Sequence, residues 1–289
     1  MPKMDKCKNY PPKLVAMVIS SVSNLQQREV IRSTWASSKY SKAIRDGKAL
    51  VYFIVSKPKN RRMLEQIKAE DRKYSDVVMV DLEESYDNLV LKVYSSIIYS
   101  TRFCEQAGFH MKVDDDVMVH VDRLFHYLID SVSMRNQLIC KVWDYSLPVR
   151  KTKSKWYVPK EDWPHRKFPK YCNGPMYIIG MKAASKILNA VQKTDFLKLE
   201  DVLFTGIAAK TAKINHVYWG THIRAHSEEM WWGLDECDRK KEPLMLSVHS
   251  LSTTEKMKQG HDVLRNLNCS SRAKIDERRK EEYKKKKKH

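Results

Sequence analysis

The sequence predicts an α/β protein with an open, mixed but mostly parallel sheet flanked by helices. Short apolar runs alternate along the chain with stretches of helical periodicity, the order found in sheets whose strands are joined by helices. With 289 residues, of which 42% are hydrophobic and 10% aromatic, the chain can bury a globular core. In such sheets, ligands bind beyond the carboxyl ends of the strands.

The first half of the chain supplies these elements in order. Strands are predicted at 14–19, 50–55 and 77–80, and helices at 26–35, 60–72 and 88–106. The last of these helices has Leu89, Val93 and Ile97 at intervals of four residues, which places them on one face. A further helix is predicted at 181–193, and another begins near 199.

Residues 109–121 are the most informative segment. Asp114, Asp115 and Asp116 stand between two apolar runs, a pattern typical of strand, tight turn and strand. Carboxylates about 4–7 Å apart repel one another unless a cation joins them. Mg²⁺ and Mn²⁺ prefer such oxygens and keep positions for substrate phosphates. The triplet therefore indicates a metal-diphosphate site at a strand end, although alone it also fits a solvated acidic turn.

The segment 143–177 has a different composition. It holds three of the seven tryptophans and five of the ten prolines, which disfavour regular helix. Residues 141–170 also carry nine basic and three acidic side chains. Exposed Trp beside Lys can stack on sugar or base rings and pair with phosphates, whereas the alternative is a long loop anchored to the core by its aromatic rings.

The charge and cysteine content restrict the class of protein. Of the net charge of +19, the stretch 272–289 contributes ten basic and four acidic residues. We expect a lead-in at 1–13, one domain at 14–268 and a basic, disordered tail at 269–289. The six widely spaced cysteines include no C-x-x-C pair, which argues against zinc or thioredoxin-like sites but permits up to three disulfides.

Seven blocks in order resemble a known family. They are Arg28–Trp35, Glu84–Lys92, Met111–Val117, Ser154–Val158, Tyr171–Gly174, Glu200–Val202 and Val248–His249. Together they resemble the β-1,3-galactosyl and N-acetylglucosaminyl transferases of glycosyltransferase family 31, over roughly 14–255. The first block looks like R-x-x-I-R-x-T-W and the third like K-x-D-D-D-V.

The resemblance implies an inverting hexosyltransferase with a GT-A fold and a Rossmann-like nucleotide-sugar-binding half. Its donor would be UDP-galactose or UDP-N-acetylglucosamine, its cofactor Mn²⁺ or Mg²⁺, and its acceptor a glycan on protein or lipid, joined in β-1,3 linkage. Members of this family are type II Golgi membrane proteins. We therefore expect action in the Golgi lumen, although the sequence contains no run of about 18 apolar residues that would form an anchor.

The resemblance also implies roles for individual residues. Asp116 would bind the metal, Asp114 would face metal and donor, Asp115 would support the donor side, and His249 would complete the metal shell. Asp201 is the expected base, with Glu200 as second choice. Both could instead complement a helix dipole.

Four further residues are expected at the donor. Arg28 and Arg32, four residues apart on one helix face, would pair with the diphosphate. The alternative is that they form salt bridges to carboxylates of the sheet. Lys155 and Trp156 are expected in the donor or acceptor loop.

Two rival functions remain at this stage. A catalytically inactive sugar-binding relative is disfavoured because the Asp triplet and Asp201 are all present. A basic nucleic-acid-binding protein would account for the charge of +19, but it has no use for three carboxylates in the same groove. We therefore expect no nucleic-acid partner.

Overall fold

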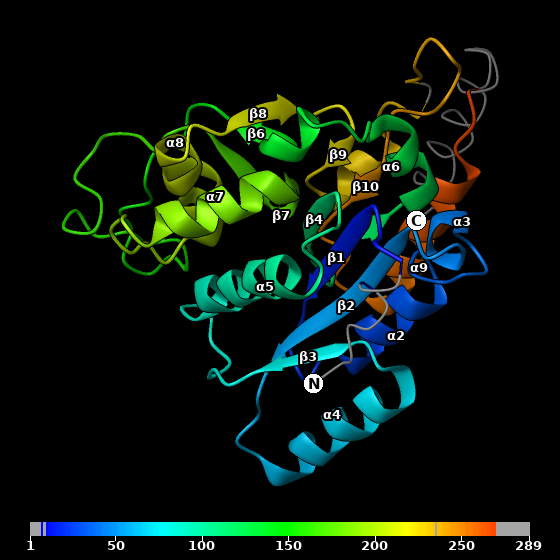
Figure 1. Cartoon of the computed structure of the whole chain (residues 1–289), viewed down its shortest axis with the longest axis horizontal. Helices are drawn as coiled ribbons and strands as arrows, with labels where there is room; N and C mark the ends of the chain where they lie inside the picture. The colour runs from blue at the N-terminus through cyan, green and yellow to red at the C-terminus, as the bar shows by residue number, and fades with distance from the viewer. Residues whose placement is uncertain (1–6, 8–9, 235, 270–289) are drawn as a thin grey trace, which may run out of the picture.

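The computed structural model describes residue 7 and residues 10–234 and 236–269 (Figure 1). Most of the expected lead-in and the expected tail from 270 onward lie outside these residues. Cys269, the first residue assigned to that tail, is bonded to Cys237.

A seven-stranded sheet forms the centre of the molecule, in the order β3-β2-β1-β4-β7-β6-β8. Its strands are β1 (Leu14–Ile19), β2 (Ala49–Ser56), β3 (Val77–Val80), β4 (Phe109–Asp114), β6 (Gln137–Trp143), β7 (Tyr171–Gly180) and β8 (Asn215–Tyr218). β7 runs antiparallel to its neighbours β4 and β6, and the other neighbouring pairs are parallel. The predicted mixed, mostly parallel sheet is confirmed.

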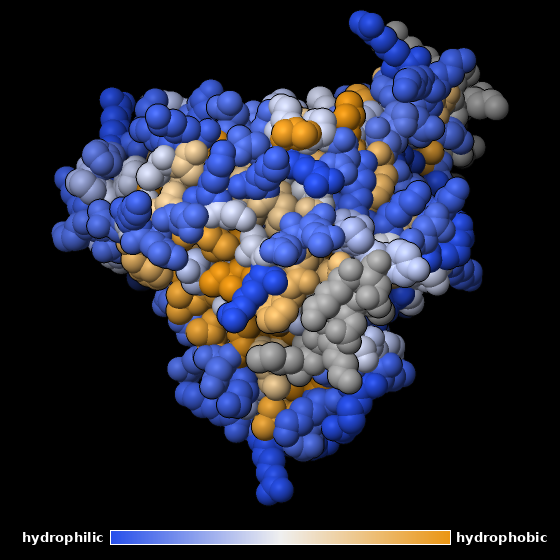
Figure 2. Space-filling model, in the orientation of Figure 1, coloured by the Kyte–Doolittle hydropathy of each residue, from blue (hydrophilic) through white to orange (hydrophobic). Residues whose placement is uncertain are grey.

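Helices cover both faces of this sheet (Figure 1). They are α2 (Leu25–Ser33), α3 (Lys42–Arg45), α4 (Arg61–Tyr74), α5 (Leu89–Phe103), α6 (Val121–Tyr127), α7 (Met181–Val191), α8 (Ala209–Thr211) and α9 (Thr254–Asn266). Side chains of β1 alternate between two cores, one shared with α5 and α7 and the other with α2, α6 and α9. Because both faces are buried, β1 is apolar throughout. On the face in Figure 2, hydrophilic side chains predominate and apolar ones gather over α5.

A smaller sheet sits beside the first and consists of β5 (Met118–Val119), β9 (Ile223–Arg224) and β10 (Ser247–Val248). β10 lies between the other two strands, antiparallel to β5 and parallel to β9. The apolar run after the Asp triplet therefore pairs with the C-terminal part of the chain. The 3₁₀ helices η1 (Met134–Asn136) and η3 (Ser227–Trp231) complete the connections.

Two sequence expectations need correction. The region 143–177 is irregular only from 144 to 170, because 171–177 belongs to β7 and pairs with β4 and β6. The helix predicted to begin near 199 is present, but its central part is a π-helix, η2 (Val202–Ala208), which continues into α8. The other predicted helices and strands agree with the structure to within three residues at each end.

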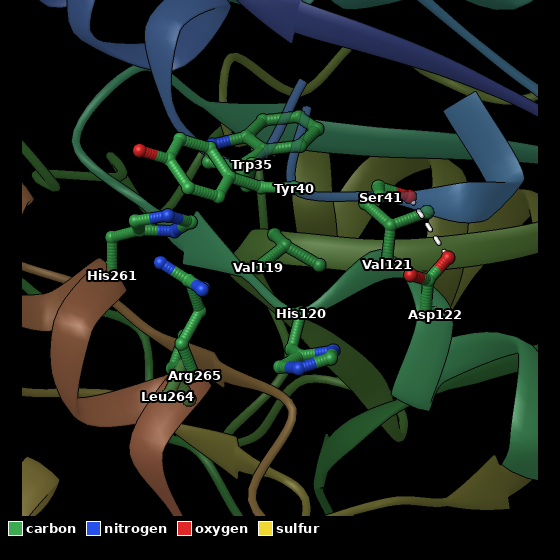
Figure 3. A pocket seen from close by; sticks show the side chains of 10 residues that line it. All are labelled: Trp35, Tyr40, Ser41, Val119, His120, Val121, Asp122, His261, Leu264 and Arg265. Carbon is green, nitrogen blue, oxygen red and sulfur yellow. Dashed lines mark hydrogen bonds between the residues drawn. The ribbon is translucent and has the colours of Figure 1, made fainter. Parts of the chain in front are cut away.

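The C-terminal helix α9 packs against the segments that follow α2 (Figure 3). The ring of His261 meets Tyr40 edge-on at 5.1 Å, and the Arg265 guanidinium lies 4.4 Å from the same tyrosine ring. Trp35 completes this wall of a pocket of about 10 Å³. A pocket of this size takes about one water molecule, so this contact serves packing and not substrate binding.

Three disulfides join distant segments, Cys7–Cys104, Cys140–Cys172 and Cys237–Cys269. The second links β6 to β7 at the base of the loop 144–170. Within the described part of the chain, no helix has the length and apolar character needed to cross a bilayer.

Candidate active site

The fold gives the three adjacent aspartates different surroundings. Asp114 ends β4 and lies in register with Ile19 at the end of β1. Asp115 turns toward the segment after β1, where it accepts hydrogen bonds from Ser20 Oγ (2.6 Å) and Asn24 Nδ2 (2.9 Å). Asp115 is therefore held by the protein itself and braces the turn.

The small sheet brings His249 to Asp116. His249 follows β10 directly, and its backbone N–H donates to Arg224 O in β9. The N–H of Leu251 donates to Asp116 O at 3.2 Å. As a result, His249 Nε2 lies 3.4 Å from Asp116 Oδ2. One ligand atom each from Asp114, Asp116 and His249 can be chosen so that all lie within 4.8 Å of one another.

The hydrogen bonding of His249 shows that this cluster suits a cation. Its Nδ1 lies 2.7 Å from Ala225 O, an atom that can only accept, so Nδ1 carries a proton. In the neutral ring, Nε2 then directs a lone pair toward the Asp116 carboxylate. Burial alone would lower the pKa of His249, but the carboxylate of Asp116 outweighs it and raises that pKa. Two carboxylates and an imidazole fit Mn²⁺ or Mg²⁺.

A buried lysine joins this cluster to a second group of carboxylates. Lys112 Nζ lies 2.7 Å from Asp114 Oδ1 and 3.0 Å from Glu200 Oε1, and it donates to Gly174 O at 2.6 Å. Tyr177 donates its hydroxyl proton to Glu200 Oε2 at 2.6 Å. Burial would lower the pKa of Lys112, but the two carboxylates raise it, so this side chain stays charged.

Asp201 differs from its neighbour Glu200 in access and in proton affinity. Glu200 is buried, whereas Asp201 is partly exposed and lines the cleft. Burial, followed by the nearby Glu200 charge, raises the pKa of Asp201 to about 7. A Cβ on Gly174 would lie 3.1 Å from Asp201 Oδ2, so glycine leaves that carboxylate room. A partly exposed carboxylate with this pKa is suited to accept a proton near neutral pH.

Most of these groups line one cleft of about 450 Å³, a size typical of ligand sites, whereas Asp116 and Tyr177 are not among its lining residues. Its lining includes Asp114, His249, Glu200, Asp201, Lys155 and Trp156. The structure thus brings the expected loop residues Lys155 and Trp156 to the expected carboxylates. The Lys155 ammonium lies 4.8 Å from the Trp156 ring centroid.

The assignment of Arg28 and Arg32 to the diphosphate is corrected. Arg28 is only 1% exposed and pairs with Glu70 at 2.7 Å. Arg32 pairs with Glu70 at 2.7 Å and with Asp76 at 2.8 Å. Both arginines thus form salt bridges, as the alternative held, but the carboxylates lie in α4 and just before β3, not in the sheet itself. Arg28 also donates to Ser20 Oγ (3.1 Å), the group that holds Asp115.

Sequence reasoning missed the roles of Lys112 and Tyr177. A signal for Lys112 was present, because a lysine inside an apolar strand two residues before Asp114 points to the same side of that strand. Tyr177 is the cross-strand partner of Lys112, a relation set by the pairing of β4 with β7. No local sequence pattern predicts that β4 pairs with β7.

Comparison with known proteins agrees with this fold and site. The family model described as Galactosyltransferase matches residues 26–219. Beta-1,3-galactosyltransferase 5 of Gorilla gorilla gorilla is 32% identical over 209 residues, covering 72% of this chain and 68% of the relative. Lactosylceramide 1,3-N-acetyl-beta-D-glucosaminyltransferase A of Danio rerio is 31% identical over 226 residues, 75% of this chain and 60% of the relative.

The α/β fold and the sequence matches together define a glycosyltransferase. The chain belongs to the galactosyltransferase family, glycosyltransferase family 31, as its ordered motifs predicted. Among solved structures, a glycosyltransferase involved in the glycosylation of the major capsid of PBCV-1 aligns with 87% of this chain and 99% of its own. Its sequence identity is 9% and its TM-score 0.45, and no conclusion rests on that similarity.

Proposed function

We propose that this protein is an inverting, metal-dependent transferase that moves galactose or N-acetylglucosamine from a UDP-sugar to a glycan on protein or lipid in β-1,3 linkage. The observation that carries the proposal is the content of one cleft. Asp114, His249 and Asp201 all line it, and the buried Lys112 contacts both Asp114 and Glu200, the neighbour of Asp201.

On the donor side, Asp114, Asp116 and His249 would hold Mn²⁺ or Mg²⁺. The cation would neutralise the diphosphate so that UDP becomes a good leaving group. Lys155 and Trp156, at the cleft wall, offer an ammonium for phosphate oxygens and a ring face for the uracil or sugar.

On the acceptor side, Asp201 would take the proton of the attacking hydroxyl. As that proton moves to the carboxylate, the acceptor oxygen bonds to the anomeric carbon and the bond from this carbon to UDP breaks with its electron pair. Attack opposite the leaving group inverts the anomeric centre. Glu200 already forms a salt bridge with Lys112 and accepts a hydrogen bond from Tyr177. It would therefore position Asp201 rather than act as the base itself.

We further propose that the protein acts in the lumen of the Golgi. The support is indirect: its three disulfides fit an oxidising compartment, and the expectation for the family is Golgi.

Release of UDP from UDP-galactose and UDP-N-acetylglucosamine, with and without Mn²⁺ and a panel of β-linked acceptors, tests the proposal. We expect metal-dependent release that rises when the right acceptor is present. Asp116→Ala should abolish metal-dependent UDP binding, whereas Asp201→Asn should keep UDP binding and lose transfer. No metal-dependent release from any donor, together with retained sugar binding, would favour the inactive relative.

A further inference from the structure

A second groove, of about 530 Å³, borders the catalytic cleft. Its lining includes Trp163, His165, Lys167, Phe168, Ile207 and Lys210. Phe168 lines both the groove and the cleft, so a single side chain separates them. A ligand long enough to occupy both would have to pass Phe168, the side chain that they share.

One wall of the groove is a preorganised part of the loop 144–170. Trp163 Nε1 donates to Lys167 O at 3.2 Å, and Arg150 donates to Trp163 O at 2.6 Å. The ring of Trp163 lies 5.6 Å from that of Phe168. These contacts hold an indole in place before any ligand arrives, which lowers the entropy cost of binding.

The opposite wall is the helix that carries the proposed base. Ile207 and Lys210 lie on η2 and α8, the continuation of the chain directly after Asp201 (Figure 1). A Cβ on Gly206 would lie 3.1 Å from Tyr171 Cβ, so helix and loop are in close contact. Lys210 follows Asp201 by nine residues, which is at most about 14 Å along the axis, because 1.5 Å per residue is the α-helical rise and the wider π-turns of η2 rise less. A short oligosaccharide spans that distance.

The groove is also basic. Lys167, Lys210 and His165 line it, and none of its lining residues is Asp or Glu. Among the described residues, neither lysine forms a salt bridge with a carboxylate. Indole and phenyl faces suit the apolar faces of sugar rings, and ammonium groups without a carboxylate partner suit acidic substituents, although the Lys167 ammonium also lies 5.4 Å from the Tyr145 ring centroid.

We propose that this groove binds the distal, acidic part of an elongated acceptor glycan, with the acceptor hydroxyl of the same glycan at Asp201. The ligand class is an oligosaccharide bearing carboxylate or sulfate groups. This inference rests on the proposed function for the other end of the glycan, while binding in the groove can be measured without transfer.

The direct test is binding of sialylated, sulfated and neutral oligosaccharides of equal length, measured by calorimetry on the whole chain. Charge-assisted contacts predict a Kd about tenfold lower for at least one acidic ligand. The double variant Lys167→Glu/Lys210→Glu should remove this preference. Lys182→Glu/Lys186→Glu, on exposed positions of α7 outside the groove, changes the charge equally and should leave it intact. Equal binding of all ligands, or equal effects of both double variants, would overturn the inference.

Transfer kinetics separate this inference from the proposed function. With a donor and an acceptor between which the protein transfers sugar, Lys167→Glu/Lys210→Glu should raise KM for long acidic acceptors. It should leave kcat and the KM for a disaccharide acceptor unchanged. Trp163→Ala should weaken the binding of long acidic and long neutral ligands equally. If no acceptor is glycosylated at all, the proposed function fails, and the binding experiment still decides whether the groove holds an acidic glycan.

Discussion

Lys112 is the residue that makes the two halves of the site interdependent. Its single ammonium contacts Asp114, on the proposed donor side, and Glu200, on the proposed acceptor side, and it is 1% exposed. A buried cation between two carboxylates costs desolvation, but removing it leaves both negative charges without a counter-charge. Stability and chemistry therefore depend on the same atom.

Replacing Lys112 by Met should lower the free energy of unfolding by about 3–5 kcal/mol, because Asp114 and Glu200 lose their cation. Urea unfolding measures this directly. Lys59 forms a salt bridge with Glu83 in which both side chains are largely exposed, and Lys59→Met should change stability by less than about 1 kcal/mol. Similar losses for the two variants would show that Lys112 is not the essential counter-charge.

The proton affinity of Asp201 predicts a pH dependence. Burial and the Glu200 charge raise its pKa to about 7, and only the deprotonated carboxylate can accept a proton. The rate of transfer at saturating donor should therefore rise with pH and level off above an apparent pKa near 7. A profile that is flat from pH 6 to 8, or that falls, would place the base elsewhere. Residual transfer by Asp201→Asn should lack this titration.

At this scale, residue type and spacing indicated Asp114, whereas Asp201 and His249 were expected from the family resemblance. Asp114, Asp201 and His249 were expected together and line the same cleft. Arg28 was misassigned because a guanidinium suits a phosphate and a carboxylate equally. Its true partner, Glu70, lies 42 residues away on another helix, and only the packing of α4 reveals it.

Among the elements, the π-helix η2 determines where Asp201 lies. Thr205 Oγ1 donates to Asp201 O and accepts from Cys172 N at 2.8 Å. His216 Nε2 lies 2.7 Å from Thr205 O, within hydrogen-bonding distance. These bonds tie the widened helical turn to β7 and β8. π-turns are rare and occur frequently at functional sites, which fits a helix that begins at the proposed base.

Thr205→Val should destabilise η2 more than the small change in side-chain shape suggests. The valine keeps the shape but leaves Cys172 N–H buried without an acceptor, a loss of about 1–3 kcal/mol in unfolding free energy. Because Asp201 loses a backbone contact, we expect kcat to fall while the affinity for UDP is unchanged. Thr205→Ser keeps the hydroxyl and serves as the control. Full activity of the valine variant would mean that η2 positions Asp201 without this bond.

Elements with strong local periodicity could be predicted, and those made by long-range pairing could not. β1 to β3 and the helices near them follow from apolar runs and helical spacing. β9 and β10 have two residues each and exist only because β10 pairs with both β5 and β9. Residues 171–177 include Asn173, Gly174 and Pro175, which disfavour a strand locally, so their place in β7 follows from pairing with β4 and β6.

On the scale of the whole molecule, the disulfides join segments that lie far apart in the sequence and that the sheets already bring together. Cys7–Cys104 ties the N-terminal side to the end of α5, and Cys237–Cys269 ties the segment after α9 to that after η3. Cys140–Cys172 closes the loop 144–170, which supplies one wall of the cleft. The even cysteine count permitted three bonds, but only the fold selects these pairs among the 15 connectivities that six cysteines allow.

The separations between the bonded cysteines predict how much each disulfide stabilises the protein. They are 97 residues for Cys7–Cys104 and 32 for Cys140–Cys172, for which chain entropy gives about 4.7 and about 3.7 kcal/mol. Urea unfolding of the two Cys→Ser double variants should follow that order. Opening Cys140–Cys172 should in addition raise KM for the donor, because it frees the loop that holds Lys155 and Trp156. Opening Cys7–Cys104 should spare KM, since that bond lies at the far end of α5 from the cleft residue Leu89. An equal rise in KM for both variants would show that the loop is held in place by its own packing, without help from the disulfide.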